Sequence, residues 1–113
     1  MSSRSPRLYV EDIKQACGEI LDFTREITNA EDFGKDRRTF LAVVHSLEVM
    51  GEAARQMPRG FKSAHPEILW REVASLRNVI AHEYFGLDHE IIWDVIKTQI
   101  PGLIEKFQDL EIG

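Results

Sequence analysis

Four polar side chains that could do chemistry lie close together in the segment from residue 76 to residue 84, LRNVIAHEY: Arg77, Asn78, His82 and Tyr84. The imidazole of His82 can exchange protons near neutral pH. The guanidinium of Arg77 keeps its charge and can bind two phosphate oxygens as a fork, so it can stabilise negative charge that develops on a phosphoryl group. Asn78 could orient His82 or donate a hydrogen bond to a phosphate.

The spacing of these residues limits how they can act together. Arg77 and His82 are five positions apart, so in one regular helix their side chains diverge by about 140°. Asn78 and His82 are four apart and share one face, whereas Tyr84 follows Arg77 by about two turns on a neighbouring face. Either the helix ends near His82, or a second copy of the chain completes the site.

Composition narrows the class of protein. With 113 residues, 43% of them hydrophobic, the chain fits a single domain covering residues 1–113. The formal net charge of -5 argues against binding nucleic acid through bulk charge, so any RNA contact would be local. Cys17 is the only cysteine, which excludes an intrachain disulfide and fits a reducing compartment. There is no apolar signal core and no apolar run of membrane-spanning length, so we expect a soluble, cytoplasmic protein.

Apolar residues recur at three- and four-residue intervals, which predicts four amphipathic helices and no strand. The first begins at Ser5 and Pro6, and the second has a stripe that runs from Phe40 to Met57 and stops before Pro58. The segments 29–34 and 58–60 are interpreted as a break and a turn. The third helix is expected to begin near His65–Pro66 and to carry the polar segment. The fourth follows Asp88, with a kink at Pro101. We predict an all-α protein, a four- to five-helix up-and-down bundle.

The polar segment resembles a known family. Arg77, His82 and Tyr84 fit the Arg-x4-His-x-Tyr signature of HEPN-domain proteins, specifically the small HepT-like toxins that pair with a minimal nucleotidyltransferase antitoxin. The segment 47–54, LEVMGEAA, resembles the second helix of that family, and residues 84–93 resemble its passage into the final helix. The similarity extends from Leu8 to about residue 107. One departure is that His45 and Ser46 stand where the family has a basic residue and often an asparagine, so the sequence assigns no phosphate contact there.

This resemblance implies a HEPN-like homodimer in which the motif helices of two subunits face each other across a cleft. It also implies metal-independent endoribonuclease activity on transfer or messenger RNA, with Arg77 and His82 catalytic, Asn78 supporting, and products that carry 2′,3′-cyclic phosphate and 5′-hydroxyl ends. Tyr84 would accept AMP from the nucleotidyltransferase antitoxin of a type II toxin–antitoxin pair. Each added AMP would place negative charge and bulk beside the cleft and so obstruct RNA.

Each of these residues also has an ordinary interpretation. Arg77 and His82 could favourably meet the negative end of a helix dipole, and Tyr84 could be a buried aromatic. Glu48 and Glu52, one turn apart in the second helix, form either a solvated face or a support that orients Arg77 or a histidine. Gly51 fits close helix packing better than ligand binding.

No cofactor and no metal is expected. The four histidines, His45, His65, His82 and His89, show no paired ligand spacing, and the chain has no glycine-rich phosphate-binding loop. The competing hypothesis is a noncatalytic helical binding module that partners a minimal nucleotidyltransferase, which the acidic net charge and the missing basic residue at His45 both favour. Toxicity of this chain expressed alone would support only the ribonuclease.

Overall fold

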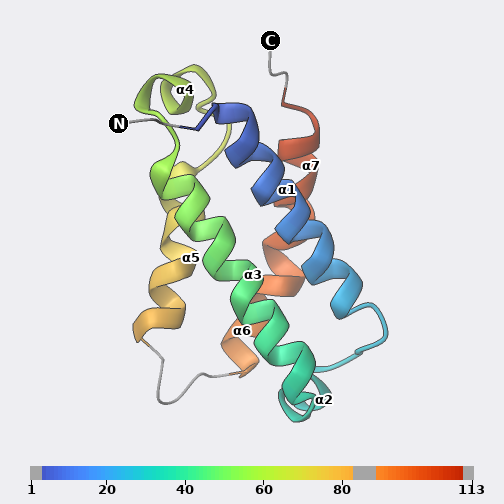
Figure 1. The fold of residues 1–113 in the computed structure, drawn as a ribbon. Coiled ribbons are helices and arrows are strands. Elements are labelled where there is room, and N and C mark those ends of the chain that lie inside the picture. Colours follow the sequence, from blue (N-terminus) through green and yellow to red (C-terminus); the bar gives the residue numbers. More distant parts are fainter. Residues whose placement is uncertain (1–3, 83–88, 111–113) are drawn as a thin grey trace.

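The structure, a computed structural model, describes residues 4–82 and 89–110, and in the helix that ends at His82 it describes side chains only as far as Arg77. The described residues form helices and no strand, which confirms the predicted all-α class (Figure 1). Five longer helices and two of six residues each follow one another in this order: α1 (Pro6–Phe23), α2 (Ala30–Lys35), α3 (Arg37–Gln56), α4 (Arg59–Ala64), α5 (Trp70–His82), α6 (His89–Thr98) and α7 (Ile100–Gln108).

The first helix begins where the sequence predicts. The Ser5 side chain accepts a hydrogen bond from the backbone N–H of Arg7 at 3.3 Å, and Pro6 occupies the first turn, where its missing N–H costs nothing. Asp36 caps α3 in the same way, accepting from the N–H of Thr39 at 3.1 Å. The hydrogen bonds that Asp36 accepts from the backbone N–H and then from the hydroxyl of Thr39 lower the pKa of its carboxyl.

Two segments interpreted as a break and a turn are short helices. Asn29 does not interrupt the chain but caps α2, since its side chain accepts from the N–H of Asp32 at 2.8 Å. Pro58 likewise precedes α4 directly. Six residues span less than two turns, too few to show a repeating apolar stripe. The predictions for 29–34 and 58–60 are therefore wrong.

The start of the third predicted helix is also corrected. His65 ends α4, and helix α5 begins only at Trp70. Between them the N–H of Ile68 donates to the carbonyl of His65, and the side chain of Leu69 is 55% exposed.

The fourth predicted helix is broken in two at Gln99, two residues before Pro101. Proline lacks the N–H that a continuous helix needs and crowds the preceding turn, so the predicted kink at Pro101 becomes a break. As a result the two halves contact different helices: α6 packs against α2, and α7 packs against α1.

Helix α3 lies at the centre of the bundle and packs along α1 on one side and α5 on the other (Figure 1). Its buried stripe matches the predicted one: Phe40, Val43, Val44, Leu47, Met50, Ala54 and Met57. Aromatic side chains close the two ends of the core. The rings of Trp70 and Phe107 meet edge to face with their centroids 5.6 Å apart, and the ring centroids of Phe33 and Trp93 are 5.5 Å apart. None of the helices described is long and apolar enough to cross a membrane.

Candidate functional site

A glycine sets the separation of α3 and α5. A Cβ atom added at Gly51 would lie 2.6 Å from the Cβ atom of Arg77 and 2.8 Å from its backbone nitrogen, closer than real Cβ atoms approach their neighbours. Only glycine therefore fits at this contact. The prediction that Gly51 permits close helix packing is confirmed, and the contact partner is Arg77 itself.

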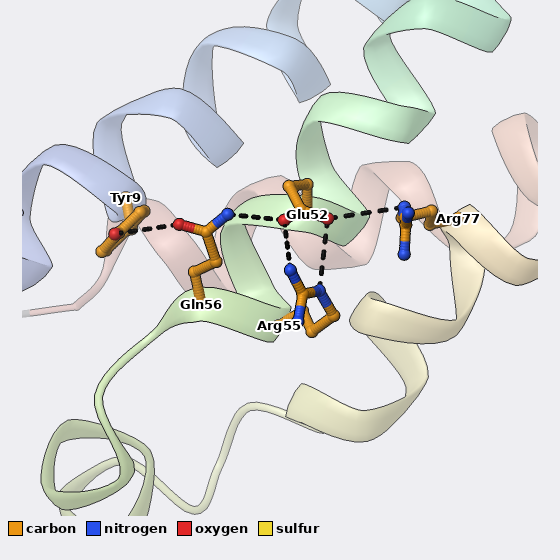
Figure 2. A network of polar contacts seen from close by, with 5 residues as sticks. All are labelled: Tyr9, Glu52, Arg55, Gln56 and Arg77. Atoms are coloured by element: carbon orange, nitrogen blue, oxygen red, sulfur yellow. Dashed lines mark hydrogen bonds and ion pairs between the residues drawn. The ribbon is translucent and has the colours of Figure 1, made fainter.

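The close approach brings Arg77 beside a carboxylate of α3. The Nε atom of Arg77 lies 3.4 Å from Oε1 of Glu52, and Figure 2 shows the two side chains meeting between their helices. The side chain of Arg77 is 50% exposed, so one part of the guanidinium is held while another faces solvent. This arrangement suits an arginine that binds an external anion.

Glu52 is held in turn by its own helix. The Arg55 guanidinium donates to both carboxylate oxygens, at 3.2 Å and 2.6 Å, and the Gln56 amide donates to Oε2. The hydroxyl of Tyr9 donates to the Gln56 carbonyl oxygen at 3.2 Å (Figure 2). A chain of polar contacts thus runs from α1 across α3 to Arg77 on α5.

These contacts fix the charge of Glu52. The pKa of Glu52 is lowered to about 2, chiefly by the hydrogen bonds from Arg55 and then by that from Gln56. The positive charges of Arg55 and Arg77 add to this effect, and desolvation opposes it. Glu52 is therefore ionised at neutral pH. A carboxylate with so low a pKa is a poor proton carrier at that pH and a good anchor for a guanidinium.

An open pocket of about 360 Å³ lies beside this network. Its walls come from the N-terminal segment and α1 (Arg4, Tyr9, Asp12), from α3 (His45, Glu48, Val49, Glu52, Ala53, Gln56) and from α5 (Arg77). On the α1 side, Arg4 pairs with Asp12 at 2.7 Å and stacks over the Tyr9 ring at 4.9 Å. A second hollow of about 300 Å³ continues along α1 and α3 and shares Asp12, His45 and Val49.

The structure brings together three of the residues that the sequence singled out. Arg77 and Glu52 are in contact, and Glu48 lines the same pocket. Asn78 and His82 lie in α5, but their side chains fall outside the described part of the structure, as does Tyr84 altogether. Their roles stay predictions.

Sequence reasoning missed the residues that hold Glu52. Arg55 and Gln56 follow it by three and four positions, a spacing at which helical side chains meet, so this part of the network was open to prediction. Tyr9 and Arg4 belong to a distant segment of the chain, and no local pattern connects them to α3. Among the described residues, no group of three His, Cys, Asp or Glu side chains could hold a metal ion.

Fold and pocket define a small helical-bundle protein in which a half-exposed arginine, paired with a glutamate, lines an open pocket. The chain belongs to the ribonuclease HepT-like family, whose family model matches residues 13–110. This confirms the resemblance that the motif and helix blocks indicated.

Curated relatives cover nearly the whole chain. A protein of Thermococcus cleftensis named "Probable ribonuclease HepT" is 47% identical over 107 residues, which are 95% of this chain and 96% of that protein. A protein of Methanocaldococcus jannaschii is 36% identical over 110 residues (97% and 90%), and one of Caldanaerobacter subterraneus subsp. tengcongensis is 37% identical over 107 residues (95% and 95%). Both are named as candidate RNases. No solved structure matches the chain significantly. Membership of this family supports a role as an RNase.

Proposed function

We propose that this protein is a metal-independent endoribonuclease that acts as a homodimer and serves as the toxin of a type II toxin–antitoxin pair. The observation that carries the proposal is the half-exposed Arg77 guanidinium, anchored by Glu52 at the wall of a pocket, in a chain of the ribonuclease HepT-like family. The catalytic residues are Arg77 and His82, with Asn78, Glu48 and Glu52 in support.

The geometry of α5 supports a site shared by two subunits. Because α5 is helical from Trp70 to His82, the positions of Arg77 and His82 are about 140° apart around one helix axis. Among the described residues, α5 packs mainly against α3 and its Trp70 meets Phe107 of α7, while Arg71, Glu72 and Arg77 are exposed. This exposed part of α5 could meet a second copy. Arg77 of one subunit then works with His82 of the other.

The proposed reaction is attack of a ribose 2′-hydroxyl on the adjacent phosphorus. A bond forms between the 2′-oxygen and phosphorus, the bond from phosphorus to the 5′-oxygen breaks, and the products are a 2′,3′-cyclic phosphate and a 5′-hydroxyl. One proton leaves the 2′-hydroxyl and one is gained by the 5′-oxygen, and His82 takes part in this transfer. Arg77 stabilises the extra negative charge on the phosphoryl oxygens while Glu52 keeps its guanidinium in place.

In the same proposal Tyr84 is the point of control. A minimal nucleotidyltransferase transfers AMP from ATP to its hydroxyl, two residues beyond His82. The tyrosine oxygen forms a bond to the α-phosphorus, the bond from that phosphorus to pyrophosphate breaks, and the hydroxyl loses its proton. The added phosphate brings negative charge to a position two residues beyond His82 in the sequence, and this charge would compete with RNA for the site.

The test is cleavage of transfer and messenger RNA in excess chelator by the parent, Arg77→Ala and His82→Ala. We expect cyclic phosphate ends from the parent and a loss of roughly 100-fold or more in both variants, since each removes a group that acts on the transition state. Arg71→Ala is the matched control, because Arg71 is exposed on the same helix but does not line the pocket. Equal cleavage by the folded parent, Arg77→Ala and His82→Ala proteins would refute the catalytic assignment.

Mixing the two inactive variants tests the shared site. In a mixed dimer one site combines an intact Arg77 with an intact His82, so random re-association restores about a quarter of the parental activity. If both residues of a site come from one chain, the mixture stays inactive.

The formal net charge of -5 favours a second candidate, a noncatalytic module that binds a minimal nucleotidyltransferase. A dimeric parent that binds such a partner but cleaves no RNA would support it. The mass of peptides containing Tyr84 must first exclude prior AMP addition.

A further inference from the structure

Glu48 differs from the other carboxylates of the Arg77 pocket. Asp12 is paired with Arg4, and Glu52 is held by Arg55, Gln56 and Arg77. Glu48 is exposed and has no hydrogen bond or ion pair with any other described residue. As far as the described side chains go, Glu48 is therefore the one carboxylate of the pocket whose two oxygens are open to an external donor.

Glu48 also has a defined position relative to Arg77. It precedes Glu52 by four residues, which is one turn or about 6 Å along α3, on the same face of the helix. His45 precedes Glu48 by a further three residues, is exposed and lines the same pocket. Between these polar groups the wall of the pocket is apolar, formed by Val49 and Ala53. A ligand bound by Arg77 at one end would reach Glu48 and then His45 at the other.

The chemistry of Arg77, Glu48 and His45 indicates which class of ligand fits this pocket. A free carboxylate repels a second phosphate but accepts N–H donors, which nucleobases present along their edges. Guanine alone among the four RNA bases offers two adjacent N–H donors on its Watson–Crick edge, which match the two oxygens of a carboxylate. Exposed imidazole rings stack on unpaired bases. The volume of about 360 Å³ is within the range of about 300–1,000 Å³ for small-molecule sites.

We propose that His45 and Glu48 form a nucleobase subsite that binds an unpaired guanine beside the phosphate held by Arg77. The position of that phosphate rests on the proposed ribonuclease function. In this subsite the Glu48 carboxylate accepts the N1–H and N2–H groups of the base while the His45 ring stacks on its face. The subsite gives cleavage a preference for guanine next to the scissile phosphate, and it gives His45 a use in binding RNA that needs no positive charge.

Mononucleotide binding tests the subsite without requiring cleavage. The 5′-monophosphates of guanosine, adenosine, cytidine and uridine are titrated into the parent, Glu48→Gln and Glu105→Gln by calorimetry or by protein amide NMR shifts. We expect guanosine monophosphate to bind the parent most tightly, and Glu48→Gln to weaken that binding by roughly 10-fold or more, as for other bidentate base contacts. The other three nucleotides should lose far less. Glu105→Gln is the control, since Glu105 is an exposed carboxylate of α7 that does not line the pocket.

Stacking by His45 has a separate signature. His45→Ala should weaken all four nucleotides by roughly 5- to 100-fold, and His45→Phe should restore binding, because any aromatic face can stack. A His45→Phe protein that binds as poorly as His45→Ala would contradict stacking.

Cleavage of single-stranded oligonucleotides that differ only in the bases flanking one phosphate completes the test. Preference for guanine in the parent, lost in Glu48→Gln, supports the subsite. Equal binding of the four nucleotides, or guanosine binding unchanged in Glu48→Gln, overturns it, whether or not RNA is cleaved. Guanosine binding that depends on Glu48 in a protein that cleaves no RNA would instead retain the subsite and refute the ribonuclease.

Discussion

Replacing Gly51 by alanine tests the contact that places Arg77. The added methyl carbon would lie 2.6 Å from the Cβ atom and 2.8 Å from the backbone nitrogen of Arg77, and 3.2 Å from the carbonyl oxygen of Ala74. None of these atoms belongs to the far end of a flexible side chain. The clash is therefore relieved only if α3 and α5 move apart.

Two effects of opposite sign determine the change in the free energy of unfolding. Overpacking a close contact costs about 1–3 kcal/mol, and the rigid backbone atoms at this site favour the upper end of that range. Alanine in place of glycine within a helix contributes about 1 kcal/mol in the opposite direction. We expect a net loss of about 1–2 kcal/mol, which lowers Tm by roughly 5–15 °C in a domain of this size.

Gly18→Ala is the matched control. Gly18 lies inside α1, and nothing comes within 4 Å of a Cβ atom added there. Only the helix-propensity effect remains, so this variant should be as stable as the parent or more stable by up to about 1 kcal/mol.

Thermal and urea unfolding, followed by circular dichroism, measures both variants. If Gly51→Ala were as stable as Gly18→Ala, α3 and α5 would not approach as described. The anchoring of Arg77 by Glu52 would then lose its structural basis. RNA cleavage by Gly51→Ala, measured well below its Tm, should also fall, because the displaced guanidinium no longer meets Glu52.

Three other predictions concern separate parts of the molecule. The pKa of Glu52 is lowered from 4.5 to about 2, so its ionised form stabilises the fold above pH 4.5, and this contribution is lost as the pH falls towards 2. The urea midpoint should therefore fall more steeply over this pH range for the parent than for Glu52→Gln. Burial raises the pKa of the Cys17 thiol to about 12, so iodoacetamide at pH 8 should modify it only on unfolding, and rapid alkylation of the native protein would contradict its burial. Gly34→Ala would place a Cβ atom 2.6 Å from Cγ of His89, so the imidazole ring at the contact of α2 and α6 must shift. We expect a smaller loss of Tm than for Gly51→Ala, since an imidazole can shift more easily than backbone, and an unchanged Tm would show that the ring moves without cost.

The long helices could be predicted from the sequence because their stabilising contacts repeat locally. The apolar stripe of α3, the cap at Ser5 and the interruption at Pro101 depend on residues within one or two turns. The short helices α2 and α4 could not be predicted in this way. Their apolar contacts are few, and α2 is held by Phe33 packing on Phe40 and Trp93, which lie in other helices.

The residues of the candidate site also divide into those with a local sequence signal and those without one. The spacing of Glu48 and Glu52 put both on one face, and Gly51 indicated a close helix contact. Arg77, the residue that meets Gly51 and Glu52, lies 25 positions after Glu52. This contact depends on how α5 packs on α3, and the apolar periodicity of the sequence does not encode that packing. The Tyr9–Gln56 hydrogen bond spans 47 positions and has no local signal at all.

The two tryptophans form a pair of built-in optical probes. The Trp70 indole donates to the carbonyl of His65 at 3.0 Å and meets Phe107, near the end of the bundle where α4 and α7 lie (Figure 1). Trp93 instead packs on Phe33, near the opposite end, with the Lys97 ammonium 4.9 Å from its ring. Indole emission depends on local polarity and charge, so single-tryptophan variants would report on each end separately. Such a pair could show at which end a bound nucleotide or a second subunit changes the bundle.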